Sequence, residues 1–174
     1  MALREILTEP NRVLRQKSLP VEKVDEDLRK LIDDMLETMY AAPGIGLAAI
    51  QVGVPKRVIV LDIAQKEGQK NPMCFVNPEI IDKSKNNSTY EEGCLSVPGQ
   101  FAEIGRPDEC YVKYLDYHGQ QKEIKAKGML ATCIQHELDH LEGILFIDYL
   151  SKLKKSMIIK KLSKQKKVLE RIVV

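Results

Sequence analysis

Hydrophobic residues recur every three or four positions in two parts of the chain. Residues 25–41 and residues 129–141 both show this spacing, the first behind acidic residues and the second ahead of Gly143. Such a spacing is typical of the buried face of an α-helix, and a glycine directly after the pattern is a common helix cap. A further helix is expected to begin near Tyr149 and to continue into the C-terminal tail. The pattern therefore predicts an N-terminal, a central and a C-terminal helix.

Segments rich in β-branched and aromatic residues lie between the first two helices. They are residues 57–63, 73–81 and 110–117, and a turn at 117–120 leads into a return strand at 121–126. Consecutive strands joined by short turns pair in an antiparallel manner. The sequence thus predicts an α+β fold in which antiparallel or mixed β-sheets pack around the central helix of residues 129–141.

The length and the composition favour a single domain. A chain of 174 residues with 44% apolar residues can form one sizeable core. No repeat or low-complexity linker divides it, so residues 1–174 are expected to form one domain, with residues 151–174 as a basic helical extension. This extension holds eight lysines, one arginine and one glutamate, a net charge of +8 that leaves −6 for the other residues of a chain whose total is +2. Either an acidic partner, such as RNA or an anionic membrane, or simple solvation of a basic helix explains this asymmetry.

The distribution of apolar residues and cysteines points to the cytoplasm. The N-terminal residues lack a long apolar stretch followed by a cleavage site, and no apolar run approaches the roughly 18 residues of a membrane helix. The four cysteines are widely spaced, as is usual for free thiols in a reducing compartment. We therefore expect a cytoplasmic protein that neither enters a membrane nor binds DNA.

Two histidines in the predicted central helix have the spacing of metal ligands. His136 and His140 are four residues apart, so that they lie on one helix face about 6 Å apart along the axis. Glu137 between them can serve as an acid/base group beside an ion. Paired histidines also occur on solvated helices, but the apolar flanks of this pair indicate a buried helix, where unpaired imidazoles would be costly. The pattern predicts a mononuclear metal site in a hydrolase.

A catalytic site of this kind needs a third protein ligand. Cys133 lies seven residues from His140, which is about 10 Å of helix rise and too far for one ion, so we assign it to packing. Cys94 stands among glycines and prolines that indicate a loop, where a thiolate could reach the metal. Residue type and spacing leave Cys94 and the carboxylates of Glu142 and Asp148 as alternatives.

A turn after the first helix has features of an oxyanion site. Two glycines and several small residues precede Gln51, whose amide could donate to a developing negative charge. A tight turn packed under a strand would have the same composition. The glycines do not form a dinucleotide-binding motif, because the required third glycine is missing and a helix precedes them.

Three segments of the chain together resemble the signature motifs of bacterial peptide deformylases. These segments are GIGLAAIQ at residues 44–51, EGCLS at residues 92–96 and QHELDH at residues 135–140. The resemblance extends from Arg4 to Asp148 and the helix beyond. It implies hydrolysis of the N-formyl group of the initiator methionine of nascent polypeptides, with release of formate. The nearest enzymatic alternative is a zinc peptidase built on the same helix, and a third reading is an inactive protein that binds ribosomes through its tail.

The resemblance also implies a role for each residue of the site. It implies that Glu137 is the acid/base, that Gln51 and the backbone N–H of Leu95 hold the formyl oxygen, that Ile45 and Gly46 hold the peptide backbone, and that Cys94, His136 and His140 bind the metal. A pocket for the methionine side chain is expected beside the metal helix, with Cys133 in its lining.

The resemblance also has implications for the metal and for a partner, and the chain departs from the family pattern at one position. It implies Fe(II) as the ion in the cell, although Zn, Ni or Co can occupy such a site; the ligand types alone would have predicted zinc. It further implies that the basic C-terminal helix docks on the ribosome. Relatives often carry arginine where this chain has Phe101, so the resemblance assigns no substrate contact at that position, whereas Arg106 matches an arginine of the family.

Overall fold

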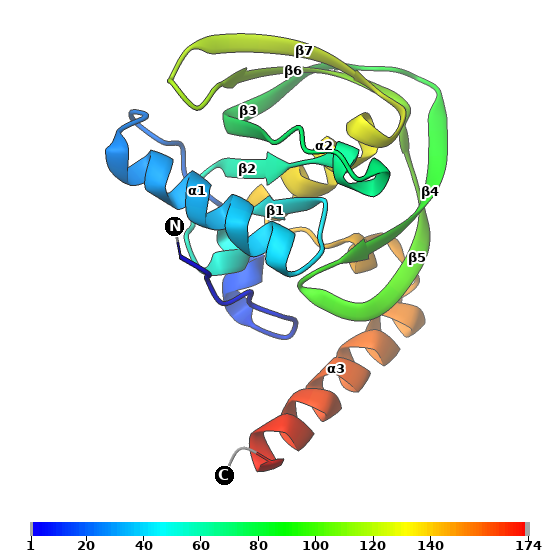
Figure 1. Cartoon of the computed structure of the whole chain (residues 1–174). Coiled ribbons are helices and arrows are strands. Elements are labelled where there is room, and N and C mark those ends of the chain that lie inside the picture. The colour runs from blue at the N-terminus through cyan, green and yellow to red at the C-terminus, as the bar shows by residue number, and fades with distance from the viewer. Residues whose placement is uncertain (1, 173–174) are drawn as a thin grey trace.

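A computed structural model of the chain describes residues 2–172 (Figure 1). The helices are α1 (Glu26–Ala41), α2 (Gly128–Leu141) and α3 (Lys152–Ile172). The strands are β1 (Gly46–Ala48), β2 (Val58–Leu61), β3 (Met73–Lys83), β4 (Asn87–Cys94), β5 (Val97–Pro107), β6 (Glu109–Leu115) and β7 (Gln121–Lys127). Short 3-10 turns lie at Arg12–Arg15, Ala49–Val52, Ile63–Glu67 and Phe146–Tyr149. The predicted α+β fold is confirmed.

The strands form two antiparallel sheets. The larger sheet has the order β1-β2-β3-β6-β7, and β4 pairs with β5 in a separate two-stranded hairpin. β1 lies at one edge of the larger sheet, with β2 as its hydrogen-bonded neighbour. The predicted turn before β7 is confirmed, since Gly119 adopts a positive φ of 79° there, which glycine tolerates without strain.

Helix α2 lies between the two sheets and is the centre of the fold. It contacts β1, β2, β6 and β7 on one side and β4 and β5 on the other. Its apolar residues Ala131, Ile134 and Leu141 are fully buried in the main core cluster, together with Ile59 and Phe75 of the larger sheet. The central position predicted for this helix is confirmed, and polar side chains on it are therefore held in a buried environment.

Helix α1 covers the other face of strands β1 and β2. Asp25 caps the helix by accepting a hydrogen bond from the N–H of Leu28 at 2.9 Å. Leu28, Ile32 and Met35 pack in a second cluster with Val58 and Val60 of β2. The prediction of a helix at residues 25–41 is confirmed, and the helix ends at Ala41, directly before the Pro43-Gly44 turn.

Several strands differ from the predicted ones. The expected strand at 57–63 is shorter, because a 3-10 turn begins at Ile63. The segment expected at 73–81 extends to Lys83 as strand β3, with irregular register around Asn77, whose φ is 50°. Strand β1 and the β4–β5 hairpin were not predicted. The expectation that Cys94 belongs to a loop is wrong, since Cys94 is the last residue of β4 and its partner is Val97 of β5.

Helix α3 is attached through its first half only. Ile158, Ile159 and Leu162 pack against Val97 and Ile104 of β5 in a third cluster, which also includes residues of the Phe146–Tyr149 turn. All residues from 164 to 172 are exposed, and Figure 1 shows this end of α3 pointing away from the rest of the chain. The helix begins at Lys152 rather than near Tyr149. Within residues 2–172, no helix has the length and hydrophobicity needed to cross a membrane.

Candidate metal centre and substrate cleft

The three candidate metal ligands meet where α2 faces the β4–β5 hairpin. His136 and His140 come from successive turns of α2, and Cys94 comes from the end of β4. Their ligand atoms all lie within 4.8 Å of one another, and Sγ of Cys94 is 3.3 Å from Nε2 of His140. The spacing of the histidines on α2 and the hairpin turn thus bring two imidazoles and one thiol to a common point. The helical spacing had predicted this convergence for the two histidines only.

The other residues considered as ligands lie outside this cluster. Glu142 forms ion pairs with Arg57 at 2.8 Å and with Lys17 at 3.3 Å. Asp148 forms ion pairs with Arg15 at 2.6 Å and with Lys155 at 2.7 Å. Among the residues described, Cys94, His136 and His140 form the group that could hold an ion, and neither Glu142 nor Asp148 belongs to it.

The cluster suits a divalent ion with affinity for sulfur and nitrogen. A thiolate and two imidazoles are the donor types preferred by zinc and by other first-row metals. Burial lowers the pKa of His140 well below its ordinary value, so this imidazole is neutral, as a ligand must be. Burial also opposes a charge on His136, yet its hydrogen bonds to Cys94 and Glu92 outweigh that effect and raise its pKa. The surroundings therefore favour a positive charge at this point, which a metal ion would supply.

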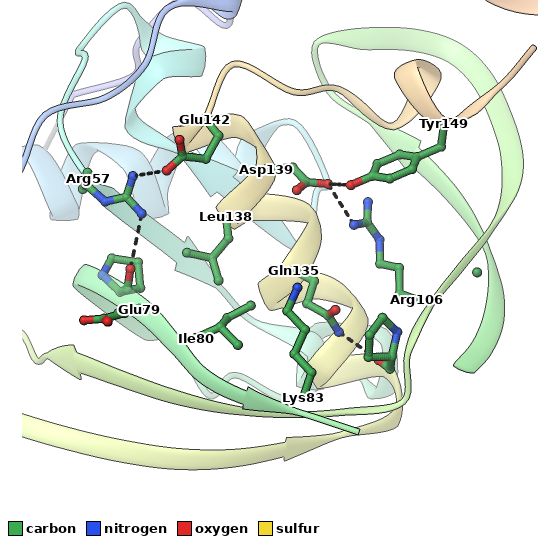
Figure 2. Close-up of a pocket in the computed structure, with 13 residues that line it drawn as sticks. Arg57, Glu79, Ile80, Lys83, Arg106, Gln135, Leu138, Asp139, Glu142 and Tyr149 are labelled. Atoms are coloured by element: carbon green, nitrogen blue, oxygen red, sulfur yellow. Dashed lines mark hydrogen bonds and ion pairs between the residues drawn. The ribbon is translucent and has the colours of Figure 1, made fainter. Parts of the chain in front are cut away.

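A chain of buried ion pairs extends from His136 to the far side of α2. Nδ1 of His136 lies 2.8 Å from Oε1 of Glu92, and Arg106 donates to both oxygens of Glu92 at 2.7 and 2.9 Å. Arg106 also donates to Asp139 at 2.9 Å, and the Tyr149 hydroxyl donates to the same oxygen at 2.7 Å (Figure 2). Burial would raise the pKa of Glu92, but His136 and Arg106 lower it below its usual value. Glu92 is therefore an ionised carboxylate that orients His136.

Glu92 and Asp139 lie within the EGCLS and QHELDH segments, and Arg106 matches an arginine of the family, but the sequence predicted no role in the site for these residues or for Tyr149. A carboxylate two residues before a candidate cysteine ligand indicates a possible partner of the metal ligands, because alternate residues of a strand point to the same face. Glu92 and Cys94 of β4 therefore both point toward α2. Once β4 is known to be a strand, the pairing of Glu92 with His136 follows from its geometry.

Glu137 is buried beside the cluster and faces the substrate cleft. Its side chain is part of the cleft lining, and burial is the largest effect on its pKa, which it raises to about 7. Gly46 packs directly against this carboxylate, and a Cβ at Gly46 would lie 3.1 Å from Cγ of Glu137 and would overlap Oε1. The absence of a side chain at Gly46 thus leaves room for the acid/base candidate.

Gln51 points its amide nitrogen at the candidate ligands. Its Oε1 accepts a hydrogen bond from the N–H of Ala48 at 2.9 Å, which fixes the orientation of the amide. Its Nε2 lies 2.9 Å from Oγ of Ser96 and 3.5 Å from Sγ of Cys94. The backbone N–H of Ser96 also points at this sulfur, at 3.4 Å. A hydrogen-bond donor is therefore held at the position where a substrate oxygen near the cluster would need one.

The predicted substrate-binding residues surround one cleft of about 590 Å³. Ile45, Gly46, Gln51 and Leu95 line it together with Cys94, His136 and Glu137. Cys133, expected both in the core and in the methionine pocket, is 9% exposed and belongs to both the core cluster and the lining. The structure thus brings every residue of the predicted site to the same place.

The polypeptide deformylase family model matches residues 3–156. The chain belongs to this family. A peptide deformylase from Pelagibacter ubique is 69% identical over 166 residues, which are 95% of this chain and 96% of the relative. The crystal structure of peptide deformylase from Ehrlichia chaffeensis is similar with a TM-score of 0.92 and 46% identity, covering 96% of this chain and 98% of the other. A second structure of the Ehrlichia chaffeensis enzyme, in complex with actinonin, gives a TM-score of 0.91 at 49% identity, with 95% and 98% covered.

Family membership confirms the expected activity. The chain is a hydrolase that removes the N-formyl group from nascent peptides and contains a metal ion, for which the Cys94, His136 and His140 cluster is the candidate site. The readings as a zinc peptidase and as an inactive ribosome-bound protein lose their basis, since the match spans almost the whole fold and the acid/base candidate Glu137 is in place.

Proposed function

We propose that Cys94, His136 and His140 hold one divalent metal ion and that Glu137 moves the protons during hydrolysis of the formyl-methionine amide. The observation that carries this proposal is the convergence of the three ligand atoms within 4.8 Å, on the wall of a cleft that Glu137 also lines. A metal bound there would polarise the formyl carbonyl and lower the pKa of water, so that water becomes a nucleophile near neutral pH.

The buried carboxylate of Glu137 accepts a proton from the attacking water. A pKa near 7 suits this role, because the group can then both take up and release a proton at neutral pH. As the oxygen–carbon bond forms and the carbon–nitrogen bond breaks, Glu137 delivers the proton to the leaving nitrogen of methionine. The products are formate and a peptide with a free α-amino group.

Backbone and amide donors stabilise the negative charge that develops on the formyl oxygen. Nε2 of Gln51 is held toward the cluster by the Ala48 and Ser96 contacts, and the N–H of Leu95 follows directly after Cys94 in the hairpin turn. Donors that are already oriented before the reaction contribute more than donors that must reorient. We assign Gln51 and Leu95 this role.

Ile45 and Gly46 bind the peptide backbone. β1 is an edge strand, so the polar groups on its outer side can pair with an extended substrate, as in other cases of strand addition. The methionine side chain would then enter the part of the cleft lined by Met129, Thr132 and Cys133. These residues precede His136 on the same face of α2, nearer the N-terminus of the helix.

Formate release from a formyl-Met-Ala-Ser peptide tests the function directly. We expect rapid release of formate from the formylated peptide and no cleavage of its unformylated counterpart. Cleavage of internal peptide bonds without formate would contradict the proposal and favour a peptidase. We further propose Fe(II) as the metal in the cell, with Zn, Ni or Co as replacements. Metal analysis of protein purified without oxygen should find iron, and the iron-containing protein should have a higher turnover than protein loaded with Zn, Ni or Co.

We also propose that the chain forms one domain that acts in the cytoplasm and docks on the ribosome through residues 151–174. The exposed end of α3 carries Lys160, Lys161, Lys164, Lys166 and Lys167, which could contact RNA phosphates. Leu153, Met157, Val168, Leu169 and Ile172 of α3 are also exposed, so the helix offers a partner apolar side chains as well as positive charge.

Removal of residues 164–174 tests docking without disturbing the packed part of the fold, because these residues follow Leu162, the last buried residue of α3. We expect weaker binding to ribosomes and a smaller salt dependence of binding, because five of the eight lysines remain in residues 151–163. Turnover of the short peptide should be unchanged. Lys122→Glu is the matched control, since Lys122 is exposed on β7 away from α3. Equal ribosome affinity of the wild type and the truncated chain across a salt series would overturn the docking proposal.

A further inference from the structure

One guanidinium connects the two elements that carry the candidate metal ligands. Arg106 of β5 donates to Glu92 from Nε and Nη2, at 2.7 and 2.9 Å, and to Asp139 from Nη1, at 2.9 Å. Glu92 precedes Cys94 by two residues on β4. Asp139 directly precedes His140 on α2. The position of the hairpin relative to the metal helix therefore depends on where Arg106 holds its two carboxylates.

The cation at this junction is buried and ionised. Arg106 is 5% exposed, and burial by itself would lower its pKa. Its contacts with Glu92 and Asp139 outweigh burial and raise the pKa above the usual range. Loss of either partner would leave a buried charge poorly compensated, which is costly. Arg106 is therefore held in one place, unlike an arginine on the surface.

Tyr149 closes this junction on the solvent side. Its hydroxyl donates to Oδ2 of Asp139 at 2.7 Å, and the same oxygen accepts from Arg106 (Figure 2). The centre of its ring lies 5.1 Å from Cζ of Arg106, within the range of a cation–π contact. Burial and the hydrogen bond to Asp139 raise the pKa of Tyr149 to about 12, so the hydroxyl keeps its proton. One exposed side chain thus fixes both a buried cation and its carboxylate partner.

These contacts lie apart from the substrate cleft. Arg106, Asp139 and Tyr149 line a separate cavity of about 480 Å³ on another face of α2, and none of the three lines the cleft. Their connection to the metal centre is Glu92, which lies 2.8 Å from Nδ1 of His136. Carboxylate partners of ligating histidines typically contribute 10- to 100-fold to metal affinity. A residue that acts through such a partner should contribute less.

We propose that Tyr149 and Asp139 are positioning residues for the metal site. They hold Arg106, and through it Glu92, so that the ring of His136 is already oriented before an ion arrives. A site that is assembled in advance loses less free energy to reorganisation on binding. The proposal rests on the metal site put forward under the proposed function.

The metal affinities of Tyr149→Phe and Tyr149→Ala test the proposal. The phenylalanine keeps the ring and loses the hydroxyl, whereas the alanine loses both contacts. Titration of the metal-free protein with Co(II) should show affinity lower by about threefold for Tyr149→Phe and by about tenfold for Tyr149→Ala. The absorption spectrum of the bound Co(II) should change as well, because it reports the geometry of the ligands. Tyr111→Ala, which removes a partly exposed ring from β6, should match the wild type.

A double variant shows whether Tyr149 acts through Asp139. If it does, Tyr149→Phe should have no further effect on metal affinity in an Asp139→Ala background. Additive losses, or wild-type affinity of Tyr149→Phe, would overturn the proposal. Urea unfolding of the metal-free proteins provides the remaining control. A lower unfolding midpoint of Tyr149→Phe with unchanged Co(II) affinity and spectrum would mean a purely structural role and would also overturn it.

Cys94→Ser separates failure of the positioning role from failure of the metal site. If the wild type binds Co(II) more tightly than Cys94→Ser, but the Tyr149 variants equal the wild type, the positioning role is wrong and the metal site stands. If Cys94→Ser binds Co(II) as tightly as the wild type, the metal site itself is wrong.

Discussion

Oε1 of Glu92 lies 2.8 Å from Nδ1 of His136, so a buried carboxylate fixes the ring of a candidate metal ligand. The same carboxylate is held by two hydrogen bonds from Arg106. Partners of this kind set the orientation of a ligating imidazole and the proton on its other nitrogen. The position of His136 therefore depends on the hairpin as well as on α2.

Glu92→Gln should weaken metal binding while leaving the three candidate ligands in place. We expect a loss of about 10- to 100-fold in metal affinity, because the amide is neutral and holds the imidazole and Arg106 less strongly. Titration of the metal-free protein with Zn(II) or Co(II) measures this. Glu103→Gln, an exposed carboxylate on β5, is the control and should bind metal normally. Equal affinities of the two variants would contradict the role given to Glu92.

Glu137→Gln should bind metal but lose turnover. The glutamine keeps the size of the side chain and cannot accept the proton of water, so kcat should fall by about 10²- to 10⁴-fold. Metal content and the thermal unfolding temperature, measured on the same sample, show whether the site remains assembled. A variant with normal metal content and normal formate release would rule out the proposed mechanism.

Gly46→Ala should impair the reaction by displacing Glu137. The added methyl group would overlap the carboxylate, and shifts of about 1 Å in a reacting group reduce rates by roughly 10²-fold. Crowding should also lower the free energy of unfolding by about 1–3 kcal/mol. Gly105→Ala is a suitable control, since the nearest atom to a Cβ there is Oγ1 of Thr89 at 3.8 Å. Formate release that falls equally in both variants would argue against a specific effect at Gly46.

The ion pairs of Asp148 should stabilise the protein in a pH-dependent manner. Burial tends to raise the pKa of Asp148, but Lys155 and Arg15 lower it below the ordinary 3.8. Since the pKa is lower in the folded state, the stabilisation is present above about pH 4 and is lost as the pH falls through the folded-state value. Urea unfolding should show Asp148→Asn less stable than the wild type at pH 7 and the difference shrinking below pH 3.8. A difference independent of pH would contradict this assignment.

The sequence predicted the helices and their chemistry better than the sheets. The spacing of Leu28, Leu31 and Met35 defines a helix face without reference to the rest of the chain, and His136 and His140 share a face for the same reason. The β4–β5 hairpin was missed because its first strand is mostly polar and its second contains Pro98 and Gly99. Its stability comes from packing on α2 and α3, which local sequence does not reveal.

The third ligand illustrates the same limit. Distance along a helix excluded Cys133, but Cys94 lies more than 40 residues from His136 in sequence, and only the fold or a family resemblance could connect them. Glu142 and Asp148 were reasonable alternatives by residue type. Their cationic partners, Arg57 and Arg15, come from distant segments and could not be assigned from sequence spacing.

The two sources of the metal ligands give the ion a mechanical role. Cys94 belongs to a two-stranded hairpin, a unit that is only marginally stable by itself, whereas His136 and His140 belong to the most deeply buried helix. An ion bound by residues of both elements would cross-link the hairpin to the helix, and this cross-link would be lost when the metal is removed. Loading with metal would then also determine how firmly the mouth of the cleft is held, so that a single ion tunes both reactivity and the rigidity of the surface that selects the substrate.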